Sequence, residues 1–278
     1  MLECVINVSE GRRRDVVDAI AAAAGRHLLD VHVDADHHRS VLTLAGAERD
    51  VADAAYEVVR AAVERIDLRH HLGAHPRLGA ADVVPFVPLG DLTIDHAVSA
   101  RRNTAARIGA GLGVPCFLYG DGDGDVIALP DVRREAFKTV FPDAGPREPH
   151  PSAGACCVGA RYVLVAYNLW LAPPATVADA KRIAAAIRTP QLRTLGLDVG
   201  GRAQVSCNLV APIAFGPAEA YDAVASHAPV ERAELVGLVP GRVVDGIPSR
   251  RWSELDVSSE RTIEARLDQA GLDGGSSM

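Results

Sequence analysis

The sequence predicts an α+β fold of two ferredoxin-like subdomains, each with helices on one face of a sheet. Short apolar runs typical of strands alternate with longer segments whose apolar residues recur at helical spacing. These elements follow the order β-α-β-β-α-β twice, as in a ferredoxin-like unit. A segment rich in Gly, Pro and Asp, residues 121–151, separates the two series. We therefore expect an N-terminal subdomain at 1–150 and a C-terminal subdomain, with a terminal helix and tail, at 151–278.

In the first half, the clearest element is a long amphipathic helix, because seven of its apolar residues fall on one face. Ser9 is expected to cap the first helix and Gly25 to end it. The glycines at 109–113 end a helix and precede a strand, the reverse of a dinucleotide fingerprint, so they predict a helix C-cap. The expected elements are a strand at Glu3–Asn7, a helix at Arg13–Ala24, strands at Leu28–Val33 and Ser40–Ala45, the long helix at Glu48–Ile66, a strand at Asp82–Val87, a helix at Thr93–Leu112 and a strand at Val114–Tyr119.

The second half repeats this order after a loop of small residues at 151–161. Thr176 is expected to cap its first helix, and Gly200-Gly201 to form a turn between two strands. The tail from Gly274 is expected to be disordered. The expected elements are a strand at Tyr162–Leu171, a helix at Thr176–Arg188, strands at Leu192–Val199 and Arg202–Leu209, a helix at Pro217–Ala228 and a strand at Ala233–Val239.

The composition is typical of a soluble cytoplasmic protein. Hydrophobic residues make up 48% of the chain, but only 4% is aromatic, so the core must be built from small aliphatic side chains. A net charge of −7 argues against a general role on nucleic acid or at a membrane surface. No apolar run reaches the length of a membrane helix, and the first ten residues do not resemble a signal peptide. The five cysteines lack metal-ligand spacing, which indicates buried, reduced thiols.

The segment Gly73–Phe86 contains the best candidate for chemistry. His75 and Arg77 lie two residues apart in a loop bounded by glycines, with a proline between them and an apolar strand after them. Imidazole titrates near neutral pH and guanidinium stays charged, which suits acid–base chemistry on an anionic substrate. On spacing alone, an ordinary loop histidine with an exposed arginine is an equally good interpretation.

Other charged or metal-binding patterns are weaker. His71 and His75 have the spacing of two metal ligands on a helix, but Gly73 and Pro76 argue against a helix, so we predict no metal. Asp121–Asp125 fails as an EF-hand, because glycine and glutamate are missing from the required positions. The arginines at 12–14 open a helix and either bind an anion or form a solvated turn. His38-Arg39-Ser40 forms a second polar cluster before a strand. The remaining histidines, including His32, His37 and His70, are expected in hydrogen-bonded loops, and Cys156 and Cys157 in inert packing.

Several blocks in order resemble the formiminotransferase family, the glutamate formimidoyltransferase part of formimidoyltransferase-cyclodeaminase. The resemblance covers nearly the whole chain, up to about Pro240. The blocks are Glu3–Arg12, Arg39–Val41, His75–Phe86, Leu118–Gly120, Gly159–Arg161, Ala166–Asn168, Ala203–Leu209 and Leu235–Pro240.

The resemblance implies two ferredoxin-like subdomains, a homodimer and transfer of a formimidoyl group from N-formimidoyl-L-glutamate to tetrahydrofolate as co-substrate, without a metal. This activity belongs to one-carbon metabolism and histidine degradation. His75 matches the catalytic histidine, and Gly145–Gly154 matches the folate-binding segment, which gives Gly145, Pro146, Pro151, Ser152, Ala153 and Gly154 as candidate folate contacts. Arg77, Arg39, His38 and Arg12 are the candidates for binding the substrate.

The sequence departs from the family pattern at several positions. Ala74 stands where glutamate is usual, His38 where asparagine is usual, and Ala153 where a folate-binding relative has tryptophan. The loop at 188–199 lacks the lysine-rich insertion of the family. Three alternatives therefore stay open: a non-catalytic folate-binding or small-molecule-binding relative, a transferase acting on another amidine or formyl donor, and metal-dependent hydrolysis by the histidine cluster.

Overall fold

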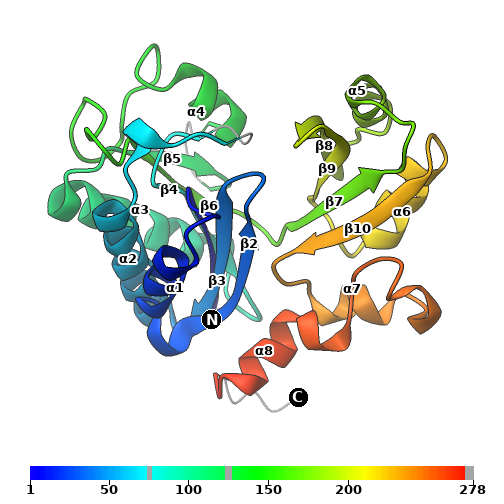
Figure 1. Ribbon diagram of the computed structural model, residues 1–278. Helices are drawn as coiled ribbons and strands as arrows, with labels where there is room; N and C mark the ends of the chain where they lie inside the picture. Colours follow the sequence, from blue (N-terminus) through cyan, green and yellow to red (C-terminus); the bar gives the residue numbers. More distant parts are fainter. Residues whose placement is uncertain (74–76, 123–126, 273–278) are drawn as a thin grey trace. The chain divides into compact units, whose positions relative to one another are not determined.

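The chain forms two compact units in the computed structural model, which describes residues 1–73, 77–122 and 127–272 (Figure 1). The first unit comprises Met1–Tyr162 together with the C-terminal residues from Ala270, and the second comprises Val163–Gln269. Each unit combines one β-sheet with helices. The predicted α+β class is therefore confirmed.

The first unit is built on a six-stranded sheet with the strand order β2-β3-β1-β4-β6-β5. The first four strands pair antiparallel in the ferredoxin-like order, and β6 runs parallel to both β4 and β5. The strands are β1 (Leu2–Val8), β2 (Leu28–Asp34), β3 (Arg39–Gly46), β4 (Ala81–Pro88), β5 (Cys116–Gly120) and β6 (Cys156–Ala160). The helices are α1 (Arg14–Ala22), α2 (Glu48–Arg65), α3 (Ile94–Leu112) and α4 (Leu129–Glu135), with 3-10 turns η1 (Gly25–His27) and η2 (Leu68–His70).

The two faces of this sheet are covered differently. Helices α1, α2 and α3 pack on one face, where the predicted stripe of α2 meets alternate residues of the strands, including Ile6, Val84 and Val158 (Figure 1). The short helix α4 lies on the opposite face, where Val132 packs with Phe117 and Cys157. Helix α4 covers only the part of that face formed by β4, β6 and β5. Polar residues of β2 and β3 can therefore also project from this face.

The second unit is a four-stranded antiparallel sheet with the ferredoxin-like order β10-β7-β9-β8. Alternate residues of its strands, such as Tyr167 and Val205, face the helices and form a separate core. Its strands are β7 (Val165–Leu171), β8 (Leu192–Val199), β9 (Arg202–Leu209) and β10 (Val230–Val236), and its helices are α5 (Val177–Ala186), α6 (Pro217–Ala225), α7 (Gly241–Asp245) and α8 (Ile263–Gln269), with 3-10 turns η3 (Ser249–Arg251) and η4 (Ser259–Arg261).

Most predicted helix boundaries are confirmed, including the start of α1 to within one residue, but the predicted cap of α1 is not. Thr176 caps α5 as expected, and Gly113 ends α3 in the left-handed conformation. The prediction that Ser9 caps α1 is wrong, because the Ser9 hydroxyl donates instead to the Gly79 carbonyl at 2.7 Å. The N-cap residue is Arg13, four residues later. The extended chain thus continues past β1 before the helix begins.

The segment expected to separate the subdomains is part of the first unit. Residues 121–151 include α4, which was not predicted, and the supposed loop of small residues contains β6. Strand β6 pairs with β4 and β5, so its backbone hydrogen bonds belong to the first sheet. We expected the division after residue 150, whereas the compact units divide after Tyr162. The tail at 274–278 lies outside the described residues.

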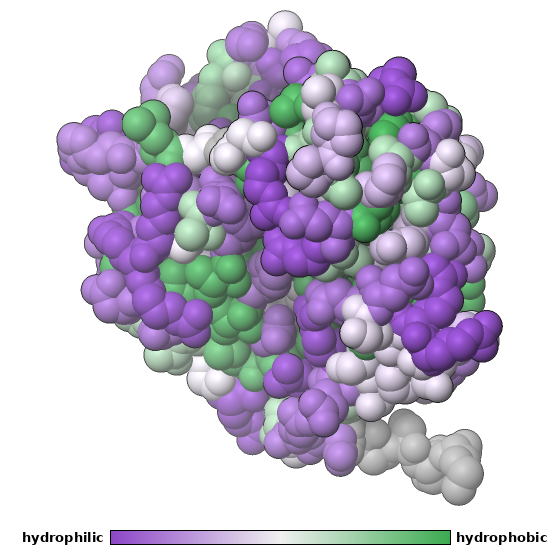
Figure 2. Space-filling view, turned by 45° about the vertical axis from the view of Figure 1, so that its right-hand side comes forward, coloured by the Kyte–Doolittle hydropathy of each residue, from purple (hydrophilic) through white to green (hydrophobic). Residues whose placement is uncertain are grey.

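The surface and the cysteines agree with the composition. Hydrophilic residues cover much of the face in Figure 2, with smaller hydrophobic areas between them. Among the described residues, none of the helices is long and apolar enough to cross a membrane. All five cysteines are free and buried, as predicted, and burial raises the pKa of the thiols of Cys4 and Cys157.

Candidate active site

The end of β1 is organised by a buried carboxylate, Glu10. Its side chain accepts the backbone N–H groups of Gly11, Arg12 and Arg13 at 2.9 to 3.0 Å and also pairs with the Arg13 guanidinium at 2.6 Å. Burial alone would raise the pKa of Glu10, but these hydrogen bonds and the Arg13 charge outweigh burial and lower it. Of the two interpretations of the arginines at 12–14, anion binding would use backbone donors at this helix start, and these N–H groups are already bonded to Glu10.

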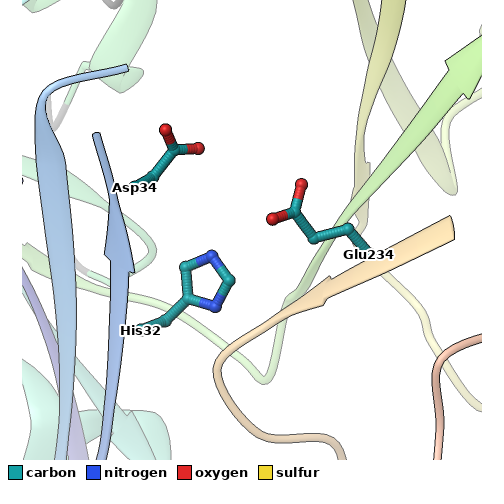
Figure 3. A group of neighbouring side chains, drawn as sticks. All are labelled: His32, Asp34 and Glu234. Carbon is teal, nitrogen blue, oxygen red and sulfur yellow. The ribbon is translucent and has the colours of Figure 1, made fainter. Parts of the chain in front are cut away.

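The turn between β2 and β3 holds a histidine–aspartate pair. Asp34 accepts a hydrogen bond from the backbone N–H of His37 at 2.8 Å, and its other oxygen lies 2.5 Å from His37 Nδ1. Figure 3 shows Asp34 and His32 projecting from the same side of β2. These two side chains are types that bind metals, but the Asp34 carboxylate is already committed to the turn. The pair therefore fixes the position of the next residues, His38 and Arg39.

Asp34 should give the protein a specific acid sensitivity. Burial raises its pKa, but hydrogen bonds and the charge of His37 outweigh burial and lower it to about 2. A carboxyl with a lowered pKa stabilises the fold above its unfolded pKa, so this contribution is lost as the pH falls from about 4 to about 2. The variant Asp34→Asn should be less stable than the parent by about 2 kcal/mol at pH 6, and the difference should shrink towards pH 2. Urea unfolding across this pH range measures it, with the exposed Asp36→Asn as the control. A pH-independent difference would contradict the assignment.

His38 and Arg77 meet around a second histidine. The His38 ring stacks on His71 with centroids 3.9 Å apart, and its Nδ1 accepts the Gly11 N–H at 3.1 Å. The Arg77 guanidinium contacts the nitrogens of the His71 ring. Burial lowers the pKa of His38. The backbone of His38 is left-handed, with φ of 51°, a conformation that asparagine adopts more readily than most residues.

Asp82, at the start of β4, anchors the backbone that follows Arg77. Its side chain is almost fully buried, and one oxygen accepts the Leu78 N–H at 2.6 Å. The other oxygen lies 2.5 Å from Nη2 of Arg133, on α4. The sequence pattern indicates only a strand at Asp82 and gives no signal at Arg133. Their separation of 51 residues hides the contact from any local pattern.

The predicted folate segment lies against both sides of the His75 loop. Ser152 O accepts from Leu68 N at 2.8 Å, and Ala153 O accepts from Ala80 N at 2.9 Å. Gly154 also pairs with Gly79 in an isolated antiparallel bridge. The structure therefore holds residues 150–154 beside segments that precede and follow residues 74–76. His75 itself lies outside the described residues, as do Ala74 and Pro76.

The other predicted site residues have varied surroundings. Arg12 is exposed, and its Nε donates to Ala35 O at 3.0 Å. Arg39 begins β3 opposite Asp34, and burial lowers the pKa of its guanidinium. Gly145 packs closely on Gly109, whereas Pro146 and Pro151 are exposed. Ser152 is half-buried. The rejected calcium loop falls partly on residues 123–126, outside the described residues.

The second unit has a polar group on the sheet face opposite its helices. Glu234, on β10, accepts hydrogen bonds from Trp170 Nε1 at 3.1 Å and from Asn168 Nδ2 at 3.3 Å. The Trp170 ring has Arg202 and Arg232 within 5 Å of its centroid. On the neighbouring strand Gln204 is fully buried, yet neither atom of its amide has a hydrogen-bond partner within the described parts of the chain. A buried amide with unmet hydrogen bonds is suited to a polar ligand.

Comparison with known proteins identifies the family. The family model described as the N-terminal subdomain of the formiminotransferase domain matches residues 1–161. The glutamate formimidoyltransferase of Streptococcus pyogenes serotype M1 is 39% identical over 232 residues, 76% of this chain and 77% of that protein. The glutamate formimidoyltransferase of Thermoplasma acidophilum is 37% identical over 301 residues, 97% and 98% of the two chains. The formimidoyltransferase-cyclodeaminase of Sus scrofa is 35% identical over 275 residues, 86% of this chain and 50% of that protein. The chain thus belongs to the formiminotransferase family of transferases.

Proposed function

We propose that this chain transfers the formimidoyl group of N-formimidoyl-L-glutamate to tetrahydrofolate by general acid–base catalysis at His75. The observation that best supports this is the convergence, in the first unit, of the segments on either side of residues 74–76 with His38, Arg77 and Asp82. The names of the relatives, glutamate formimidoyltransferases, support the formimidoyl transfer in this proposal. Catalysis by a loop histidine needs such a rigid frame, because small misplacements of a catalytic group lower the rate strongly.

The reaction needs one group that accepts and then returns a proton. The secondary amine of the reduced pteridine attacks the amidine carbon and forms a new C–N bond, while His75 takes the amine proton. The bond between that carbon and the glutamate nitrogen then breaks, and His75 returns the proton to the departing nitrogen. A neutral imidazole near its pKa at physiological pH can perform both steps. The electron count is unchanged, so no redox partner is involved.

The arginines of this region would supply the binding of the donor. Arg12, Arg39 and Arg77 carry charges that attract the carboxylates of the glutamate portion, and guanidinium matches a carboxylate in a two-point contact. His38, stacked on His71, would border the same region. The charge of the arginines makes them suitable for binding an acidic donor and unsuitable for acid–base work, since guanidinium does not lose its proton near neutral pH.

The acceptor would lie along the segment 145–154, to which we assign Gly145, Pro146, Pro151, Ser152, Ala153 and Gly154. Its exposed part includes Arg147, which suits the acidic tail of a folate. The Ala153 side chain is buried in the core of the first unit, so at this position the backbone, and not the side chain, would face the ligand.

The proposal also includes the cellular compartment and the oligomeric state of the enzyme. We place the enzyme in a reducing compartment such as the cytoplasm, in keeping with the five free buried cysteines. We also propose that it works as a homodimer. Sedimentation velocity of the purified protein tests the dimer directly.

The test of the function is turnover by the purified protein. With N-formimidoyl-L-glutamate and tetrahydrofolate together, formimidoyl-tetrahydrofolate and glutamate should appear in equal amounts, at a rate proportional to the enzyme. Omission of either substrate should stop the reaction. A persistent absence of product would contradict the proposal, and retained folate binding in calorimetry would then support a non-catalytic binder. If the protein instead transfers a group from a different amidine or formyl compound, that compound replaces N-formimidoyl-L-glutamate as the proposed donor.

A further inference from the structure

The imidazole of His38, in the turn between β2 and β3, is held by two contacts. One face of the ring stacks on the His71 ring, with the centroids 3.9 Å apart. The ring nitrogen Nδ1 accepts the backbone N–H of Gly11 at 3.1 Å. The side chain keeps 12% of its surface exposed. The ring is therefore fixed in position but remains accessible to a ligand.

The position of the Gly11 N–H is set by close packing of two backbone segments. A Cβ on Gly11 would lie 2.1 Å from the Asp34 carbonyl oxygen and 2.7 Å from the Arg39 nitrogen, so only glycine fits against this turn. The Ser40 hydroxyl also donates to the Glu10 carbonyl at 2.6 Å. These contacts join the end of β1 to the turn and hold the Gly11 N–H against the imidazole.

The hydrogen bond to Nδ1 selects one form of the His38 ring. A backbone N–H is only a donor, so the nitrogen that accepts it must carry a lone pair. In a neutral imidazole the proton is then on the other nitrogen, Nε2. Protonation of the ring would place a second donor opposite the Gly11 N–H and break this contact. The geometry therefore favours a neutral ring that presents Nε2–H as its donor.

The charges that face His38 also favour the neutral form. Burial lowers the pKa of His38 most, and the charges of Arg12, Arg77 and Arg13 lower it further. Glu10 acts in the opposite direction, with Oε1 at 3.4 Å from Nδ1. The Glu10 carboxylate already accepts three backbone N–H groups and pairs with the Arg13 guanidinium, which limits its attraction for a proton on the ring.

We propose that His38 binds a carboxylate of the donor as a neutral imidazole, through a hydrogen bond from Nε2–H. The inference rests on the proposed function, because it gives His38 a defined chemical role at the same site. Arg77 contacts the nitrogens of the His71 ring on which His38 stacks, so the guanidinium and the imidazole border one region. A carboxylate has several acceptor positions and can accept from both groups together. In this role His38 contributes affinity for the donor and carries no proton in the reaction, unlike His75.

Nitrogen-15 NMR of protein with labelled histidines tests the form of the ring without any turnover. The His38 signals are assigned by their loss in His38→Gln. At pH 7 the free protein should show an unprotonated Nδ1 and a protonated Nε2, and the ring should titrate below the ordinary histidine pKa of about 6.5. Addition of L-glutamate, as the probe, should shift the Nε2 and Nε2–H signals and leave Nδ1 unprotonated. A proton on Nδ1 at pH 7, in the free or the bound protein, would overturn the proposal.

Calorimetric titration with L-glutamate compares two substitutions at the same left-handed backbone position. His38→Phe keeps a ring that can stack on His71 but has no N–H, so it should weaken glutamate binding about 10-fold or more. His38→Gln loses the ring but keeps an amide N–H at a similar reach, so its Kd should stay within about threefold of the parent. The control His70→Gln changes an exposed imidazole and should bind glutamate as the parent does. In turnover, His38→Phe should raise KM for the donor by a similar factor and change kcat little.

A purely structural role of His38 gives different results. If the ring only packs on His71, the folded His38→Phe variant binds glutamate within about twofold of the parent, or His38→Gln loses as much affinity as His38→Phe. Either result overturns the inference. The proposed function can fail separately, since glutamate binding that depends on the N–H at residue 38, without any formimidoyl transfer, leaves the inference standing and removes the proposed reaction. Formimidoyl transfer with an unchanged donor KM in His38→Phe does the reverse.

Discussion

Replacing His75 with asparagine should lower kcat about 10²- to 10⁴-fold, the usual contribution of a general acid–base group. Asparagine is similar in size and polarity but does not carry a proton between the attacking and departing nitrogens. Donor binding depends on the arginines, so KM for formimidoylglutamate should change little. Steady-state kinetics with both substrates measure the two effects separately.

The control for this prediction is the exposed His70, at the end of η2. His70→Asn removes an imidazole five positions earlier in the chain and should leave kcat within about twofold, because the ring is not assigned any role. The limb of the pH–rate profile that reports the base should persist in His70→Asn and vanish in His75→Asn. A His75→Asn enzyme with kcat within tenfold of the parent would show that another group carries the proton.

The fold could be predicted because both units obey local rules. The stripe of α2 and the alternation in β8 and β9 follow directly from the period of each element, and β8 and β9 have the bounds predicted for them. Repetition of the β-α-β-β-α-β order then left few ways to arrange the strands. The second sheet and the first four strands of the first sheet have the ferredoxin-like order, whereas the addition of β6 and β5 to the first sheet was not predicted.

The errors arose where a distant partner decides the local structure. Ser9 has the chemistry of a helix cap, but the Gly79 carbonyl lies beside it and takes its hydroxyl proton. The helix start is organised instead by Glu10, through backbone N–H groups. Strand β6 consists of small residues with a weak pattern, and its identity as a strand depends on pairing with β4 and β5 on either side.

The candidate site was predictable in part. His38 and Arg77, apart in sequence, are brought together around His71. The supporting residues were not predictable, because Asp82 looks like the first polar residue of a strand and Arg133 like one of many arginines in a linker. Their roles follow from the contact across 51 residues, which tertiary structure alone determines.

Replacing Gly154 with alanine should destabilise the first unit by about 2–5 kcal/mol. Gly154 has φ of +68°, which costs about 1–2 kcal/mol for a residue with a Cβ. That Cβ would also lie 2.1 Å from the Leu78 carbonyl oxygen, so the backbone must shift. Overpacking of this kind adds about 1–3 kcal/mol. Urea unfolding of the variant and its parent measures the sum.

The control variant Gly113→Ala separates the cost of a left-handed backbone conformation from the cost of the steric clash of the new Cβ atom. Gly113 has φ of +64°, close to that of Gly154, but nothing lies within 4 Å of the position of its Cβ. Gly113→Ala should therefore lower the free energy of unfolding only by the conformational contribution, about 1–2 kcal/mol, and leave kcat/KM unchanged. In Gly154→Ala the shift moves the backbone bonded to Leu78, on the side of the loop that carries His75, so kcat/KM per folded molecule should fall at least about 10-fold. Equal losses of stability in the two variants would mean that Gly154 does not pack closely against the Leu78 carbonyl in solution.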